Sequence, residues 1–319
     1  MSGASPTTGA VDSVFIFIVA ISLFFLVLIT FLMIYFIIKY NKKRHAKAED
    51  IHGNTTLEII WTVIPTIIVL FMFYFGWKGF EFIRNAPEDS MEVSVTARMW
   101  SWLFEYPNGV ETDTLYVPVN TPIKLLLNSQ DVIHSFYVPA FRIKEDAVPG
   151  LQNYLWFEVS KIGEYDVLCA EYCGLQHAYM LTKVKAMPQE KFEEWYEQMR
   201  QETQSTYASS DSTQMSIEAS PKTSMAGSRL VQTRGCMACH STDGSKMIGP
   251  TFQGLFGREV VLIEDEKEIT ITADESYIRE SIMQPNKKLV KGYNPLMPSQ
   301  EGQLSDEELN AIVEYLKKL

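Results

Sequence analysis

Two long apolar runs open the sequence and set its first part apart from the rest. The first run extends from about Val14 to Ile38, and the second from about Leu57 to Phe80. Each is long enough for a helix that crosses a bilayer, which needs roughly 20 residues. The first run is also longer than the roughly 7–15 apolar residues of a signal peptide, and no small-residue cleavage site follows it. The pattern predicts that residues 1–85 form a hairpin of two retained membrane-spanning helices, at about 14–38 and 57–80.

The segment between the two apolar runs is strongly basic. It reads Lys39-Tyr-Asn-Lys-Lys-Arg-His-Ala-Lys47, and basic loops remain on the cytoplasmic side of a membrane. Trp61 and Trp77 bracket the second run, as aromatic residues at a membrane interface do. We therefore expect the N-terminus and everything after residue 80 to face outward.

From about residue 91 the pattern changes to alternating apolar and polar positions. Glu92-Val-Ser-Val-Thr-Ala97 alternates as a half-buried strand does, and the aromatic stretch Met99–Tyr106 is expected to continue this first strand. Turn signals separate further short strands, which indicates a β-sandwich or barrel. An amphipathic helix at 190–199 then completes a second unit over 86–200. The further strand candidates are 115–119, 123–127, 154–159, 164–169 and 180–186.

The remaining sequence predicts a linker and a third unit. Residues 201–224 are rich in Ser, Thr and Gln without a periodic apolar face, which is typical of a flexible linker. More ordered sequence follows the linker, and the third unit is expected over residues 225–319. The length of 319 residues is compatible with two or three domains. The formal net charge of −11 argues against a nucleic-acid partner. The four cysteines fall in two close pairs, so no disulfide framework is expected.

The densest chemistry lies in the segment Cys169-Ala-Glu-Tyr-Cys-Gly-Leu-Gln-His-Ala-Tyr-Met180. Two thiols, an imidazole and a thioether fall within twelve residues, and soft ligands of this kind favour copper. Two thiolates, Cys169 and Cys173, suggest two coppers bridged by both sulfurs, and His134 would supply the second imidazole beside His177. A disulfide would leave His177 and Met180 unexplained, and zinc does not usually recruit Met.

These residues resemble the binuclear copper A centre of cytochrome c oxidase subunit II. That family's pattern is a separate His followed by C-x-E-x-C-x-x-x-H-x-x-M, and every position is present here. The resemblance implies a cupredoxin fold for residues 91–187. It also implies that Glu171 coordinates copper through its backbone carbonyl. The Glu171 side chain would help to bind a magnesium ion shared with subunit I.

Two further residues gain a role from the same resemblance. Trp100, rather than Trp102, matches the exposed tryptophan at which electrons from cytochrome c enter, although Met99 and Ser101 depart from the family's usual neighbours. Glu58 lies at the start of the second apolar run, where a carboxylate is stabilised by the helix dipole. The resemblance offers a second interpretation, in which Glu58 marks the mouth of a proton path into subunit I.

The third unit contains Cys236-Met-Ala-Cys239-His240, a C-x-x-C-H motif. Its two thiols would attach haem covalently and its imidazole would be an axial ligand. Zinc would need a second ligand pair, and none remains in the sequence. The unit resembles a small, all-helical class I cytochrome c, in which the Pro250 carbonyl would orient the histidine.

The second axial ligand is expected to be Met297, in a Met-Pro loop. Its rivals are Met247, which is close to His240 in sequence, and Met283, which lies on an expected helix.

The chain as a whole resembles a subunit II with a fused cytochrome c domain. The resemblance implies that electrons pass from cytochrome c or another carrier to haem c and then to copper A. Subunit I would use them to reduce oxygen to water, coupled to proton pumping. The implied partners are subunits I and III, and the implied location is the bacterial plasma membrane, with the copper and haem domains on the periplasmic face. Two alternatives stay open: the electron-transfer subunit of a nitric or nitrous oxide reductase, and a free-standing membrane-anchored electron carrier.

Overall fold

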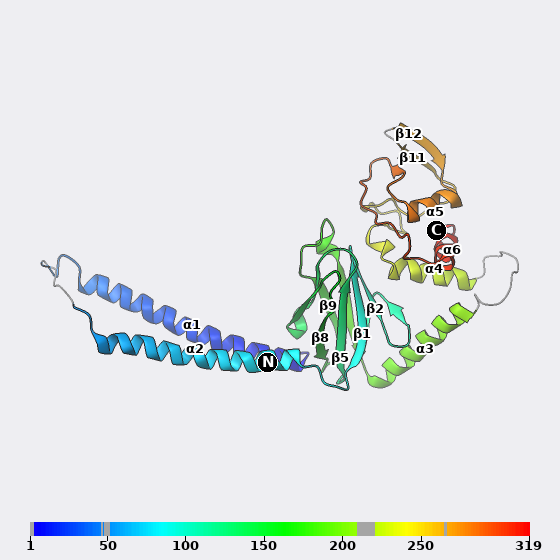
Figure 1. Ribbon diagram of the computed structural model, residues 1–319. Helices are drawn as coiled ribbons and strands as arrows, with labels where there is room; N and C mark the ends of the chain where they lie inside the picture. The colour runs from blue at the N-terminus through cyan, green and yellow to red at the C-terminus, as the bar shows by residue number, and fades with distance from the viewer. Residues whose placement is uncertain (1–2, 46, 48–51, 209–220, 265–266) are drawn as a thin grey trace.

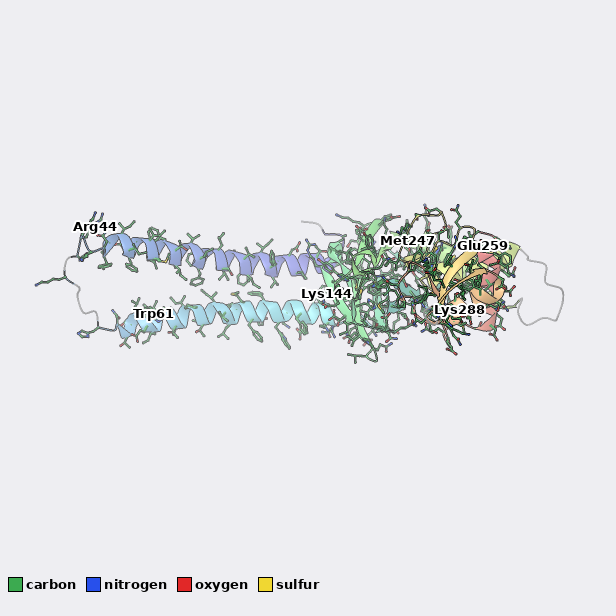
Figure 2. All side chains as sticks on the ribbon, turned by 90° about the horizontal axis from the view of Figure 1, so that it is seen from above. Arg44, Trp61, Lys144, Met247, Glu259 and Lys288 are labelled. Carbon is green, nitrogen blue, oxygen red and sulfur yellow. The ribbon has the colours of Figure 1, made fainter. Side chains whose placement is uncertain are left out.

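The computed structural model describes residues 3–45, 47, 52–208, 221–264 and 267–319. Figure 1 shows three parts in chain order: a helical hairpin, a β domain and a C-terminal domain. The hairpin consists of α1 (Pro6–Lys39) and α2 (Thr55–Arg84), which lie side by side in both Figure 1 and Figure 2. By length and composition both helices can cross a membrane, as the apolar runs predict.

Both helices extend beyond those runs because their polar ends are used for capping and docking. α1 begins with Pro6, whose fixed φ suits the first helical position. α2 begins after Asn54, whose side chain accepts a hydrogen bond from the Leu57 backbone. The start of α1 is anchored to the β domain: the Thr7 hydroxyl donates to the Phe141 carbonyl at 2.7 Å. At the end of α2, Arg84 forms a 2.7 Å ion pair with Glu145.

The β domain is a sandwich of two five-stranded sheets, which confirms the predicted fold class. Large side chains from both sheets fill its centre, among them the fully buried Phe104 and Phe136. In spatial order the first sheet contains β3 (Glu111–Thr112), β2 (Ser101–Glu105), β1 (Met91–Arg98), β5 (Pro122–Ser129) and β8 (Asn153–Glu158). The second contains β4 (Leu115–Pro118), β10 (Leu181–Met187), β9 (Gly163–Cys169), β6 (His134–Val138) and β7 (Ile143–Ala147).

One strand prediction was wrong. The aromatic stretch does not continue β1, because the chain turns at Met99 and Trp100 and β2 pairs antiparallel with β1 from Ser101 onward. Tertiary packing explains the turn: the following rings, Trp102 and Phe104, enter the core between the sheets. The turn therefore brings Arg98, Met99 and Trp100 to the end of the domain, next to the candidate copper ligands.

A long helix connects the β domain to the rest of the chain. α3 (Gln189–Ala208) packs its aromatic face on the domain, with Trp195 stacked on Tyr116 at 4.4 Å between ring centroids. α3 reaches Ala208, and α4 (Pro221–Thr233) begins at Pro221. Both ends of the expected linker 201–224 therefore have helical backbone, and residues 209–220 lie outside the described residues.

The C-terminal domain packs α4 against α6 (Asp306–Leu316), with α5 (Glu275–Met283) beside them. Gly227 permits the close crossing, because a Cβ there would lie 2.1 Å from the Ala311 carbonyl oxygen. The domain is not all-helical as expected. The alternating stretches after residue 258 form a small sheet in the order β12 (Lys267–Thr272), β11 (Glu259–Glu264) and β13 (Leu289–Val290).

Candidate copper and haem centres

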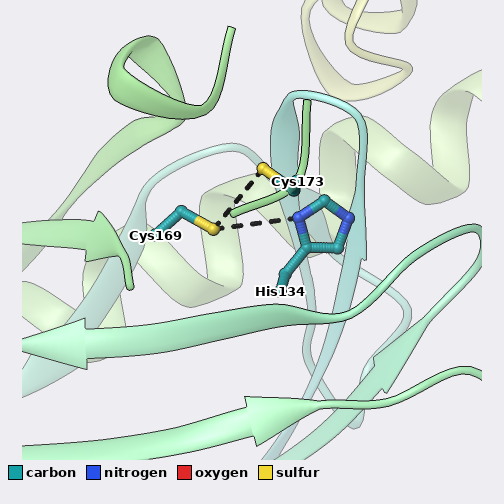
Figure 3. A group of neighbouring side chains, drawn as sticks. All are labelled: His134, Cys169 and Cys173. Carbon is teal, nitrogen blue, oxygen red and sulfur yellow. Dashed lines mark hydrogen bonds between the residues drawn. The ribbon is translucent and has the colours of Figure 1, made fainter. Parts of the chain in front are cut away.

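The sheet register brings the first two copper-ligand candidates together. Cys169 is the last residue of β9, and His134 is the first residue of the neighbouring strand β6. The two strands are antiparallel, with Phe136 opposite Cys169. The loop after β9 then folds back through the short 3-10 helix η2 (His177–Tyr179), so Cys173 returns to the same place. Figure 3 shows the His134, Cys169 and Cys173 side chains converging.

All six candidate copper ligands lie within one cluster. The two thiol sulfurs are 3.7 Å apart, well beyond the roughly 2.05 Å of a disulfide bond. Each sulfur also has its own imidazole. The remaining distances are Cys169 Sγ to His134 Nδ1 3.8 Å, Cys173 Sγ to His177 Nδ1 3.6 Å, Cys173 Sγ to Met180 Sδ 3.8 Å, and Cys169 Sγ to the Glu171 carbonyl 3.3 Å. Two thiols, each with an imidazole and one further donor, fit a pair of soft metal ions.

Asp131 orients the buried His134 ring, and sequence reasoning missed this residue. His134 Nε2 lies 2.8 Å from Asp131 Oδ1, which leaves Nδ1 facing the thiols. Asp131 also accepts the backbone N–H groups of Met99 at 2.6 Å and Val132 at 2.7 Å. Burial acts to raise the pKa of Asp131, but these hydrogen bonds outweigh it and hold the pKa below its usual value. The signal was present in the sequence, as a carboxylate three residues before the histidine.

The two thiols of the cluster differ in acidity, since the pKa of one is lowered and that of the other is raised. Burial opposes ionisation of Cys169, but hydrogen bonds from His134 and from the Ser135 and Glu171 backbone lower its pKa to about 6. Burial raises the pKa of Cys173 to about 12, and the negative charge on Cys169 adds to this effect. A second thiolate in this cluster therefore needs a compensating cation, which a bound metal ion supplies.

Trp100 lies against the ligand loop and is not exposed, contrary to expectation. Only 6% of it is accessible, and its indole N–H donates to the Cys173 carbonyl at 3.0 Å. A Cβ on Gly174 would lie 3.4 Å from the Trp100 ring, so this glycine, at φ +109°, lets the loop rest on the indole.

The haem-attachment residues surround an apolar cavity in the C-terminal domain. The motif forms the short 3-10 helix η3 (Cys236–Ala238) followed by Cys239 and the buried His240. His240 Nδ1 lies 2.7 Å from the Pro250 carbonyl, as expected, and its ring stacks on Phe252. Burial lowers the pKa of His240 and so favours the neutral imidazole that a metal needs. A Cβ on Gly249 would lie within 3.0 Å of three ring atoms, so only glycine leaves room for this ring.

The cavity wall includes a methionine as well as the attachment motif. Cys236, Cys239, His240 and Met297 all line it, while Met247 and Met283 are not among its lining residues. Two thiols, a neutral imidazole and a thioether around an apolar cavity fit a covalently attached haem. Arg98 and Met99 of the β domain also line this cavity. No motif in the sequence points to Arg98.

The Glu58 and Glu171 carboxylates are not part of the thiol cluster or of the haem cavity. Glu58 lies exposed in the first turn of α2, near Trp61 at the far end of the hairpin (Figure 2). The Glu171 side chain forms a 3.1 Å ion pair with Lys144.

Comparison with known proteins covers all three parts of the chain. Residues 1–78 match the family model of the cytochrome c oxidase subunit II transmembrane domain, residues 109–187 that of its periplasmic domain, and residues 224–319 that of cytochrome c. Cytochrome c oxidase subunit 2 of Alkalihalophilus pseudofirmus is 31% identical, over 95% of this chain and 85% of that protein. The subunit 2 of Cereibacter sphaeroides is 30% identical, over 62% and 78%.

Among solved structures, the periplasmic domain of subunit II from Bradyrhizobium japonicum is 30% identical. It covers 37% of this chain and 98% of its own, with a TM-score of 0.36. The subunit II domains imply copper A, the C-terminal domain implies haem, and the two apolar helices anchor the chain in a membrane. The chain therefore belongs to the cytochrome c oxidase subunit II family, as a membrane-anchored subunit with its own cytochrome c domain through which electrons enter a haem–copper terminal oxidase.

Proposed function

We propose that this subunit accepts electrons from an external carrier on haem c, passes them to copper A within the same chain, and delivers them to subunit I for the reduction of oxygen to water. When bound, the haem and the copper pair supply the two one-electron carriers. Cys236 and Cys239 would hold the haem, with His240 and Met297 as axial ligands. The copper ligands would be His134, Cys169, the Glu171 carbonyl, Cys173, His177 and Met180.

One observation carries the proposal: the haem cavity and the thiol cluster lie on the two sides of a single turn. Met99 lines the haem cavity. Its sulfur lies 3.8 Å from the point that a Cβ on Gly174, in the copper loop, would occupy. The next residue, Trp100, donates its indole N–H to the carbonyl of Cys173. Met99, Trp100 and Cys173 therefore form a continuous path of covalent bonds, one hydrogen bond and close packing between the two sites.

The two domains are held together by contacts around this turn. Gln176 of the copper loop donates to the Ala238 carbonyl at 3.3 Å, and Arg229 donates to the Glu111 carbonyl at 2.8 Å. Gly235 rests on Ser101, since a Cβ there would lie 2.4 Å from the serine hydroxyl. Both domains belong to one chain, so their encounter is intramolecular and independent of protein concentration.

The magnesium site, the orientation in the membrane and the partner subunits are inferred from the family resemblance and from exposed side chains of this chain. The half-exposed Glu171 carboxylate could bind magnesium at the contact with subunit I in place of its ion pair with Lys144. The basic loop after α1 supports a cytoplasmic hairpin end, which places the copper and haem domains on the periplasmic face. Subunits I and III would then cover the exposed apolar faces of the hairpin.

Flash reduction of haem c in the assembled oxidase tests the proposed path. The haem should reoxidise as the copper band is bleached, at a rate that is independent of protein concentration and only weakly dependent on salt. Trp100→Phe should slow this step at least tenfold while both metal spectra stay normal. Trp195→Phe, the same change on α3 away from the copper loop, should have no effect. An unchanged haem-to-copper transfer rate in Trp100→Phe would contradict the route through Trp100. If external electrons reduced copper before haem, the proposed order of electron entry would be wrong.

A further inference from the structure

Arg98 is a residue of the copper domain that is buried against the haem domain. It is the last residue of β1, and only 7% of it is exposed. Its guanidinium donates to the carbonyl of Thr233 and weakly to the Ser101 hydroxyl at 3.4 Å. Thr233 is the last residue of α4, three positions before Cys236. Arg98 therefore fixes the turn that leads into the haem-attachment motif, and its side chain also lines the haem cavity.

Carboxylates stabilise the charge of Arg98 from a distance and not in an ion pair: Glu111 and Asp131 both act to raise its pKa. Among the residues that the structure describes, no carboxylate lies within ion-pair distance of it, and both of its hydrogen-bond partners are neutral oxygens. Its neighbour Arg234 differs, because that guanidinium pairs with Glu308 at 2.5 Å and with Glu111 at 3.7 Å. Burial, and then the charge of Arg234, lower the pKa of Arg98, but arginine stays protonated at neutral pH. Burying a charge without an ion-pair partner costs free energy, because only part of its lost hydration is replaced.

We propose that Arg98 is a positioning residue for electron transfer from haem to copper, and that its buried charge raises the reduction potential of the docked haem. The inference rests on the proposed function of the two centres. Oxidised haem iron carries one more positive charge than reduced iron. A nearby cation in a water-poor site therefore destabilises the oxidised form more, and local charge and burial are established determinants of haem potential.

The same charge links docking to the redox state of the haem. If docking against Arg98 favours reduced haem, then reduction must favour docking by the same factor, because the coupling between two equilibria is reciprocal. The haem domain would hold its position most firmly when it carries an electron for copper. Once that electron has left, docking would weaken.

Equilibrium redox titration of haem c in the assembled oxidase tests the charge of Arg98. Arg98→Gln keeps a hydrogen-bond donor but removes the charge, and should shift the oxidised-to-reduced equilibrium about tenfold toward oxidised haem, equivalent to about 59 mV lower potential. Arg98→Lys keeps the charge and should retain most of the potential. Arg279→Gln is the control, since this arginine pairs with Glu275 outside the cavity and should leave the potential unchanged.

A second variant keeps the test valid if Arg98→Gln disturbs folding. Glu111→Gln removes the carboxylate beside Arg234 at the edge of the interface and should shift the potential in the opposite direction. Hydrogen exchange of peptides from residues 96–103 and 226–236 should show that docking loosens in Arg98→Gln, more so with reduced haem. An unchanged potential in Arg98→Gln, or an equal drop in Arg98→Lys, would overturn the proposal. If flash-reduced wild-type haem passes no electron to copper, the proposed function fails instead, and the titration still reports on Arg98.

Discussion

Replacing Asp131 with asparagine tests how the copper ligands are held and how they connect to the haem. One carboxylate oxygen accepts from His134 and Val132, and the other accepts the Met99 backbone N–H at 2.6 Å. Asparagine can keep only one acceptor oxygen. If that oxygen stays on His134, the amide NH2 group faces the Met99 N–H, so two donors meet and that hydrogen bond is lost.

The size of the effect follows from these contacts. A hydrogen bond to a charged group contributes about 1.5–3 kcal/mol, roughly twice a neutral one. Asp131→Asn weakens the His134 bond by removing the charge and abolishes the Met99 bond. The result should resemble other losses of a ligand-orienting carboxylate, with about 10–100-fold weaker metal binding. That range corresponds to about 1.4–2.7 kcal/mol, which agrees with the loss of a single charged hydrogen bond.

The copper affinity lost in Asp131→Asn is measured by competition with a chelator of known affinity. The purple mixed-valence signal is the readout. Glu164→Gln is a matched control, since Glu164 lies on the same strand as Cys169 and pairs with the surface residues Lys183 and Lys185. Asp131→Asn should also slow haem-to-copper transfer, because the Met99 turn loses its anchor. Copper affinity within twofold of the wild type would refute the idea that Asp131 sets the His134 orientation.

The remaining predictions concern the haem ligand and the hairpin. Met297→Ala should abolish the near-infrared sulfur-to-iron band of oxidised haem c and lower its potential, because a thioether ligand raises the potential; loss of the band in Met247→Ala instead would show that the wrong methionine was chosen. Glu58→Gln should slow steady-state oxygen reduction severalfold while flash-measured copper reduction stays normal. Normal turnover would leave Glu58 as a helix-end charge stabilised by the dipole.

The candidate copper site could be read from the sequence because its ligands are local. Cys169 and Met180 bracket one loop of twelve residues, and such a loop has few ways to bring four donors to one point. His134 is distant in sequence, but a strand that pairs beside β9 places it there by register. The haem motif is local for the same reason. In both motifs, residues that are close in sequence are also close in space, so the sequence spacing alone reveals the site.

Features that depend on packing between distant segments were not predicted. The aromatic stretch after β1 has strand-like composition throughout, and only the two-sheet core makes the chain turn at Met99. The same turn removes Trp100 from solvent by laying it on the copper loop. The sheet β11–β13 went unnoticed because alternation over six residues is a weak signal. The resemblance to class I cytochromes c, which are all-helical, favoured helices for this domain instead.

The contacts between the β domain and the C-terminal domain could not be predicted from the sequence, for a more specific reason. Three of the donors, Arg98, Gln176 and Arg229, all bind main-chain carbonyls: those of Thr233, Ala238 and Glu111. A carbonyl acceptor is present at every residue, so for these three donors no complementary side chain marks the partner segment. The charged pair across the interface, Arg234 with Glu111, is long at 3.7 Å. The contacts to carbonyls recognise the path of the backbone, and two of the three carbonyls belong to the turn around Cys236. That path exists only when the attachment motif is folded. The copper domain therefore recognises the haem domain by the shape of the segment that holds the haem, which is also the segment from which electrons must leave.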